Sequence, residues 1–198
     1  MAAPPSAAEW AARRRHMVEC QLRPCDVTDL AVLAAFAATP RENFVAPAAA
    51  AMAYLDSEVP ASGSSKRTLL APAVLARLLQ AARIQPGEQA LDIAGGSGYG
   101  AAIMAALGAK VASLDADPSA MKAAPFAVIL INGAFERAPD ELLRTLAEGG
   151  RLIGVEAISG APKAVLIEKV GGAIGRRVLF DANGARLDEF RRAQAFTF

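Results

Sequence analysis

The sequence is poor in the residue types on which most metal sites and catalytic triads depend. It has one histidine and two cysteines among 198 residues, so a histidine-based metal site or a catalytic triad is poorly supplied. The spacing of Cys20 and Cys25 fits neither a C-x-x-C redox pair nor a zinc knuckle. We therefore expect two reduced thiols in a cytoplasmic protein, and no metal.

Long apolar runs and a strong excess of either charge are also missing. No stretch of about 18 consecutive apolar residues could span a membrane, and the N-terminal segment lacks the apolar core of a signal peptide. The net charge of +1 gives no reason to expect a nucleic-acid surface. Residues 13–15, three arginines, are interpreted as the solvated face of a first helix rather than as a docking patch.

The sequence does contain enough apolar residues for one sizeable core. Hydrophobic residues make up 54% of the chain and charged residues 21%, which is typical of a folded protein. The length suits a single domain over residues 1–198. Within it we expect a helical, substrate-side region over residues 1–84 and a cofactor-binding α/β core over residues 85–198.

Hydrophobic periodicity predicts the order of helices and strands. Helices are expected over 9–22, ending before Pro24, and over 26–38, 47–53, 72–82, 99–107 and 139–147. The cap of the second helix is expected to be Thr28 or Asp26. Strands are expected over 89–93, 110–115, 126–131, 151–155, 164–170 and 176–180. This order predicts an α/β fold with a mostly parallel sheet and a C-terminal antiparallel hairpin that turns at Gly171-Gly172.

The strongest candidate for a ligand-binding loop is the glycine-rich segment Asp92-Ile93-Ala94-Gly95-Gly96-Ser97-Gly98, between the first parallel strand and its helix. Open α/β sheets bind ligands at this edge, where glycines allow close approach and a helix N-terminus favours an anion. Gly96-x-Gly98-x-x-Ala101 also fits a dinucleotide motif, which leaves a nicotinamide cofactor open. Asp92, an acid immediately before the glycines, favours the form of this loop found in S-adenosylmethionine-dependent methyltransferases.

Polar residues follow the two neighbouring strands at the same edge. Asp115 lies 17 residues after Gly98, close to the spacing of an acid that binds a ribose diol. The alternative is that Asp115 or Asp117 caps a following helix. Asn132 and Gly133 follow the third parallel strand and are expected to line the same pocket.

Short motifs occur in a fixed order on both sides of this loop. They are Met17-Val18-Glu19, Gln21-Leu22, Asp29, Val32-Leu33, Pro40-Arg41-Glu42, Phe44-Val45, Pro47, Ala53-Tyr54, Asp56, Pro86-Gly87, Leu91-Asp92, Gly96-Ser97-Gly98-Tyr99, Pro125-Phe126 and Gly149-Gly150-Arg151-Leu152. The series resembles the protein-L-isoaspartate O-methyltransferase family over most of residues 17–155. The resemblance implies a Rossmann-like class I methyltransferase sheet, S-adenosyl-L-methionine as cofactor, and methylation of isoaspartyl carboxylates in damaged proteins or peptides.

The resemblance also implies roles for individual residues. We expect the methionine part of the cofactor to contact Asp92, Ala94, Gly96 and Gly98, and its ribose to contact Asp115. In the stretch Thr68-Leu69-Leu70-Ala71-Pro72, Thr68 is the candidate beside the substrate. The equally weighted alternative is that Thr68 is the N-cap of the helix after Pro72.

Three departures from the family pattern bear on activity. Leu70 replaces a serine beside the substrate, and Ala94 replaces the first glycine of the loop, where a methyl group is crowded if φ is positive. Only ten residues, 116–125, join Asp115 to the next strand, fewer than a parallel crossover needs. The expected sheet therefore lacks the family's edge strand and its adenine-binding acid. A direct link of about 33 Å extended length is possible but tight, and the alternative is that a segment is left out of the numbered sequence.

Two other functions stay open, the first because of these departures and the second because of the ambiguous glycine motif. One is a non-catalytic relative that binds a partner through the same fold. The other, favoured less, is a nicotinamide-dependent oxidoreductase.

Overall fold

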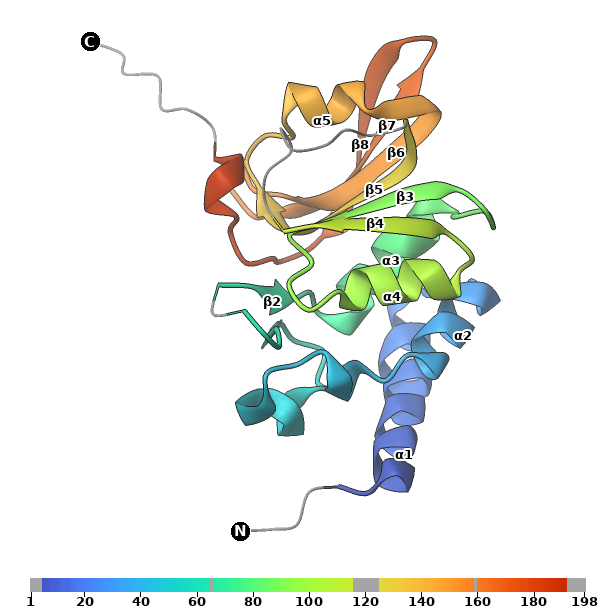
Figure 1. The fold of residues 1–198 in the computed structure, drawn as a ribbon, viewed down its shortest axis with the longest axis vertical. Helices are drawn as coiled ribbons and strands as arrows, with labels where there is room; N and C mark the ends of the chain where they lie inside the picture. Colours follow the sequence, from blue (N-terminus) through green and yellow to red (C-terminus); the bar gives the residue numbers. More distant parts are fainter. Residues whose placement is uncertain (1–4, 65, 116–124, 159, 192–198) are drawn as a thin grey trace, which may run out of the picture.

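A six-stranded sheet forms the centre of the computed structural model, which describes residues 5–64, 66–115, 125–158 and 160–191 (Figure 1). The strands are β3 (Gln89–Ile93), β4 (Lys110–Leu114), β5 (Phe126–Phe135), β6 (Leu146–Glu156), β7 (Lys163–Val170) and β8 (Ala173–Asp181). Their order is β4-β3-β5-β6-β7-β8, parallel from β4 to β6 and antiparallel from β6 to β8. The expected mostly parallel α/β sheet with a C-terminal hairpin is confirmed.

Side chains of the central strand alternate between two apolar cores. Val128 and Leu130 of β5 face one core, while Ile129 and Ile131 face the other. All four are fully buried, as expected for a parallel strand that is covered on both faces.

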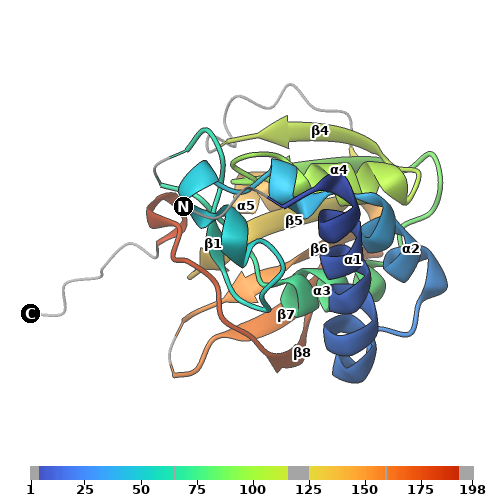
Figure 2. The same ribbon diagram turned by 90° about the horizontal axis from the view of Figure 1, so that it is seen from below.

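Helices cover the two faces unequally. One face packs against α3 (Pro72–Ala82) and α4 (Tyr99–Ala106), with α1 (Ala7–Met17) and α2 (Leu30–Ala38) outside them (Figure 1 and Figure 2). The other face is covered by the short α5 (Asp140–Arg144) and by Leu187 and Phe190 of the C-terminal segment. A two-stranded hairpin, β1 (Val59–Pro60) and β2 (Thr68–Leu69), lies outside the main sheet.

Capping side chains place the first two helices differently from the sequence-based expectation. Ser6 and Glu9 form a capping box, so α1 begins at Ala7. The expected end at residue 22 coincides with the end of a π-helix (Val18–Leu22) that continues α1, and a single 3₁₀ turn (Arg23–Cys25) carries the chain past Pro24. The expected cap of α2 is wrong: Asp29 accepts the backbone N–H groups of Ala31 and Val32.

Other boundaries move by a few residues. Strand β5 continues to Phe135 beyond a register shift, and α5 ends at Arg144, where Thr145 bonds the carbonyl of Leu142. In the described part of the chain, no strand lies beyond β4 and no helix is long and apolar enough to cross a membrane. The expected short link, and any helix capped by Asp115 or Asp117, fall on residues 116–124, outside the described residues. The division at residue 84 stays a prediction.

Candidate cofactor and substrate site

The sheet register brings three strand ends to one edge. Ile93 of β3 pairs with Leu114 of β4 and with Ile131 of β5. Asp115 and Asn132 therefore follow on either side of the glycine-rich loop, which leads directly into α4. This is the arrangement that the sequence pattern predicts.

The loop is built on left-handed backbone conformations. Ala94 has φ = 57°, Gly96 has φ = 59° and Gly98 has φ = 83°. An alanine in this region costs roughly 1–2 kcal/mol relative to an ordinary conformation. The Ala94 methyl group is fully buried, and its N–H donates to the Leu114 carbonyl at 2.9 Å. The backbone at Ala94 therefore has the positive φ at which its methyl group is expected to be crowded.

The carboxylate of Asp92 lies beneath the loop. Its Oδ2 accepts the Ala101 N–H at 3.0 Å and its Oδ1 accepts from Nδ2 of Asn132. A β-carbon on Gly95 would lie 2.9 Å from Asp92 Cγ, and one on Gly100 would lie 3.0 Å from Asn132 Nδ2. Glycine at both positions thus leaves room for the buried carboxylate and its amide partner.

Burial gives the carboxyl group of Asp92 an unusually high pKa. Desolvation raises the pKa of its carboxyl group from 3.8 to about 7, against the opposing effect of the two hydrogen bonds from Ala101 and Asn132. Among the described residues no cation is paired with it. A strongly perturbed acid at a ligand-binding edge marks a candidate functional residue.

A small cavity gathers four of the expected cofactor residues. Its volume is about 100 Å³, and it is lined by Asp92, Gly95, Gly96, Gly98, Ser113, Leu114 and Asp115. Three other expected residues lie outside this lining. The methyl group of Ala94 points into the apolar core, Asn132 bonds Asp92, and Gly133 packs against Ala185 and Leu187.

A larger cavity shares Asp115 with the first. Its volume is about 700 Å³, within the range of small-molecule sites, and it is lined by Gly63, Ser64, Lys66, Arg67, Asp115, Arg186, Asp188 and Glu189. Together the two cavities suit a nucleoside-linked amino acid. Gly98 has no atom within 4 Å of the place where a β-carbon would stand, and the Ser97 hydroxyl is buried without a partner among the described residues.

Arg67 lines the larger cavity and contacts Asp115, the residue that both cavities share. Its Nε lies 3.1 Å from Asp115 Oδ1, and its Nη2 lies 2.7 Å from the Asp115 carbonyl oxygen and 2.7 Å from Glu189 Oε1. A β-carbon on Gly96 would lie 2.8 Å from Arg67 Cβ. The hairpin that carries Arg67 therefore rests directly on the glycine-rich loop.

Thr68 follows Arg67 and faces an acid. Its hydroxyl donates to Glu58 Oε2 at 3.0 Å, and the same oxygen accepts the Ala185 N–H at 2.8 Å. The N-cap alternative for Thr68 is wrong, because Asp56 accepts the Ala73 N–H in the first turn of α3. Glu58 and Asp56 border a further cavity of about 570 Å³.

Leu70 turns away from these cavities. Its side chain is 1% exposed and belongs to the main apolar core. Its carbonyl accepts from Nη2 of the fully buried Arg41 at 2.9 Å, and the Arg41 guanidinium stacks over the Tyr99 ring at 4.8 Å. The leucine therefore contributes to packing and not to the wall of the cleft.

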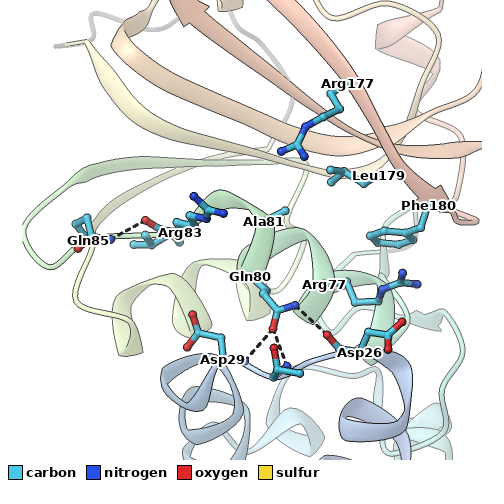
Figure 3. Close-up of a pocket in the computed structure, with 12 residues that line it drawn as sticks. Asp26, Asp29, Arg77, Gln80, Ala81, Arg83, Gln85, Arg177, Leu179 and Phe180 are labelled. Atoms are coloured by element: carbon cyan, nitrogen blue, oxygen red, sulfur yellow. Dashed lines mark hydrogen bonds between the residues drawn. The ribbon is translucent and has the colours of Figure 1, made fainter.

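A separate cleft lies between α3 and β8, where strand β3 begins (Figure 3). Its volume is about 650 Å³. At its base the Gln80 side chain accepts the backbone N–H groups of Thr28 and Asp29 and donates to the Asp26 carbonyl. Gln80 thus ties the segment before α2 to α3, and no residue of the glycine-rich loop lines this cleft.

Solved structures share this architecture. A protein-L-isoaspartate O-methyltransferase structure from Plasmodium falciparum, in complex with S-adenosyl-L-homocysteine, matches with a TM-score of 0.73 and 20% identity, covering 89% of this chain and 98% of that one. A second protein-L-isoaspartate O-methyltransferase structure matches with a TM-score of 0.72, 20% identity, and coverage of 89% and 67%. The fold is that of a Rossmann-like methyltransferase.

Sequence comparisons identify the family within this class. A model of protein-L-isoaspartate(D-aspartate) O-methyltransferase matches residues 12–117. The protein-L-isoaspartate O-methyltransferase of Gloeobacter violaceus is 37% identical over 69% of this chain and 79% of its own length. That of Koribacter versatilis is 31% identical over 91% and 93%. The chain belongs to the protein-L-isoaspartate O-methyltransferase family of S-adenosylmethionine-dependent protein carboxyl methyltransferases.

Family membership answers the cofactor question that the glycines alone left open, in favour of S-adenosylmethionine over a nicotinamide. Within the described ranges, no group of three histidine, cysteine or acidic side chains is arranged to hold a metal ion. Sequence reasoning missed Arg67 and Glu58. Both lie beside the Thr68 stretch, but no motif distinguishes them from ordinary surface charges.

Proposed function

We propose that this chain methylates the free carboxylate of isoaspartyl residues in proteins or peptides, using S-adenosyl-L-methionine, and that it acts in the cytoplasm. The observation that carries the proposal is the meeting of the glycine-rich loop with Asp115 at one sheet edge, beneath a hairpin that carries Thr68. The free thiols of Cys20 and Cys25 suit a reducing compartment.

The reaction asks little acid–base chemistry of the protein. When bound, the cofactor supplies an activated sulfonium methyl group. A carboxylate substrate is already ionised at neutral pH, so one oxygen–carbon bond forms, one carbon–sulfur bond breaks, and no proton moves. The chain's own work is therefore to orient the two groups and to exclude water.

Individual residues are assigned to these tasks as proposals. The backbone at Gly96 and Gly98 offers close approach to the methionine part, Asp92 lies beneath it, and Asp115 accepts from the ribose hydroxyls. Thr68 borders the substrate. Its proton is engaged by Glu58 at 3.0 Å, so the Thr68 hydroxyl can donate to a substrate carboxylate, which only accepts hydrogen bonds, once the bond to Glu58 is released.

Calorimetric titration with S-adenosylhomocysteine, followed by transfer of labelled methyl groups to a peptide, tests the proposal. An isoaspartyl peptide should accept the label, and the same peptide with a normal aspartate, the matched control, should not. Binding of S-adenosylhomocysteine without transfer would instead support the non-catalytic relative. No binding would refute the cofactor site.

A further inference from the structure

Arg67 lines the larger cavity and bonds Asp115, the residue that the two cavities share. The Arg67 guanidinium donates to Asp115, the acid proposed for the ribose. Its Nε donates to the Asp115 carboxylate and its Nη2 to the Asp115 backbone carbonyl. Its other partner is Glu189 in the C-terminal segment. One guanidinium thus joins the β1–β2 hairpin, the end of β4 and the short helical turn Asp188–Phe190.

The two ends of this bridge differ in exposure. The Arg67 side chain is 11% exposed, whereas the Asp115 carboxylate is 69% exposed. Asp115 can therefore be reached from solvent, and its pair with Arg67 is of the weak, solvent-screened kind. A ribose diol that donates to both carboxylate oxygens would compete with the Arg67 Nε for Oδ1.

Acidic side chains are numerous around the site, which matters for an anionic substrate. Asp115, Asp188 and Glu189 line the larger cavity together with the cations Lys66, Arg67 and Arg186, whereas Asp56, Glu58 and Asp181 line the neighbouring cavity, whose lining among the described residues contains no lysine or arginine. A carboxylate substrate approaching this region meets repulsion unless a cation receives it.

The cations of the larger cavity are not equivalent. Arg186 lies 3.5 Å from Glu136, and Lys66 is exposed at the rim. Arg67 alone of these three is pressed against the glycine-rich loop, with its Cβ 2.8 Å from where a β-carbon on Gly96 would stand. Its planar guanidinium is also suited to bind a carboxylate through two parallel hydrogen bonds.

We propose that Arg67 exchanges partners: cofactor binding draws Asp115 away from both Nε and Nη2, and these two donors then receive the substrate carboxylate while Nη2 keeps Glu189. Arg67 is in this sense a substrate-binding residue whose guanidinium is occupied by Asp115 in the absence of cofactor. This inference rests on the proposed function. It adds that cofactor and substrate binding are coupled, so each ligand tightens the binding of the other.

The variant Arg67→Gln tests the exchange, with Lys66→Gln as the control that removes a neighbouring positive charge. Without the competing pair, Arg67→Gln should bind S-adenosylhomocysteine about two- to five-fold more tightly, as expected for loss of a weak ion pair. The KM for an isoaspartyl peptide should rise about ten-fold or more, with kcat changed much less. Lys66→Gln should change neither quantity by more than about two-fold.

Calorimetry on the wild-type protein gives a second readout that does not depend on turnover. The isoaspartyl peptide should bind about five-fold more tightly when S-adenosylhomocysteine is present, and this difference should vanish in Arg67→Gln. Arg67→Lys, which keeps the charge but loses the planar donor pair, should show an intermediate KM and guards against misfolding of the glutamine variant.

The outcomes separate this inference from the proposed function. Equal or weaker binding of S-adenosylhomocysteine in Arg67→Gln, or an equal rise in KM in Lys66→Gln, would overturn the exchange and leave the methyltransferase assignment intact. No binding of S-adenosylhomocysteine by the wild-type protein would overturn the proposed function itself.

Discussion

Replacing the buried acid Asp92 by asparagine should change how stability depends on pH. In the folded protein burial raises the pKa of this carboxyl group to about 7, whereas in the unfolded chain it returns to about 3.9. Between these values the folded state holds a proton that the unfolded state releases. The free energy of unfolding of the wild-type protein therefore falls as pH rises from about 4 to about 7, and levels off above that.

The size of the effect follows from the two pKa values. Each pKa unit corresponds to about 1.4 kcal/mol, so the rise from 3.8 to about 7 is worth about 4 kcal/mol. An asparagine at this position carries no such cost. Its carbonyl oxygen can accept the Ala101 N–H, and its amide can donate to Asn132 once that side chain turns its oxygen toward it.

Urea unfolding followed by circular dichroism, at intervals from pH 4 to pH 9, measures both proteins. The free energy of unfolding of Asp92→Asn minus that of the wild type should increase between pH 4 and pH 7, by at most about 4 kcal/mol. Glu88 is a second carboxyl group with a shifted pKa. Burial alone would raise its pKa, but the hydrogen bonds from Arg151 and from the Gln85 N–H keep that pKa below its usual value. This titration affects both proteins equally and cancels in the difference. A difference that does not vary with pH would refute the reasoning.

Three further substitutions probe the loop and the hairpin. Ala94→Gly should relieve a left-handed conformation worth roughly 1–2 kcal/mol at the cost of one buried methyl group, raising the melting temperature by a few degrees; a lower melting temperature would contradict the strain. Gly95→Ala should destabilise the protein by about 1–3 kcal/mol in urea titrations by crowding Asp92, while the control Gly175→Ala, whose β-carbon has space, should be close to neutral. Thr68→Val should lower kcat/KM for the isoaspartyl peptide about ten-fold without altering S-adenosylhomocysteine affinity; unchanged kcat/KM would remove Thr68 from the substrate site.

The sequence predicted the features that depend on strand ends. Ile93, Leu114 and Ile131 meet in register across the three parallel strands, and the apolar run that the sequence shows for each strand ends at or next to these residues, so Asp115 and Asn132 could be placed beside the loop in advance. The shape of the loop was harder. The positive φ of Ala94 depends on a turn that the alanine itself disfavours, and only the family pattern, which has glycine there, indicated it.

Long-range polar contacts could not be predicted. Arg67 meets Asp115 across 48 positions of sequence and Glu189 across more than a hundred, and no local periodicity encodes such a pair. The capping of α3 by Asp56 has the same origin, since the acid lies 17 residues before Ala73. Where a residue's role depends on a partner from a distant segment, local propensity favours the nearest candidate, which is why Thr68 was the apparent cap.

The buried carboxyl group of Asp92 is suited to bind the amino group of the cofactor. A cation placed beside a buried carboxyl group lowers its pKa, and the amino group of S-adenosylhomocysteine is such a cation. Binding should therefore release a proton from Asp92 at neutral pH, and affinity should rise with pH up to about 7. Calorimetry in buffers of different ionisation enthalpy measures the proton directly. In Asp92→Asn both the proton release and this pH dependence should disappear. If they persisted, the carboxyl group would not contact the cofactor, and its burial would need another explanation.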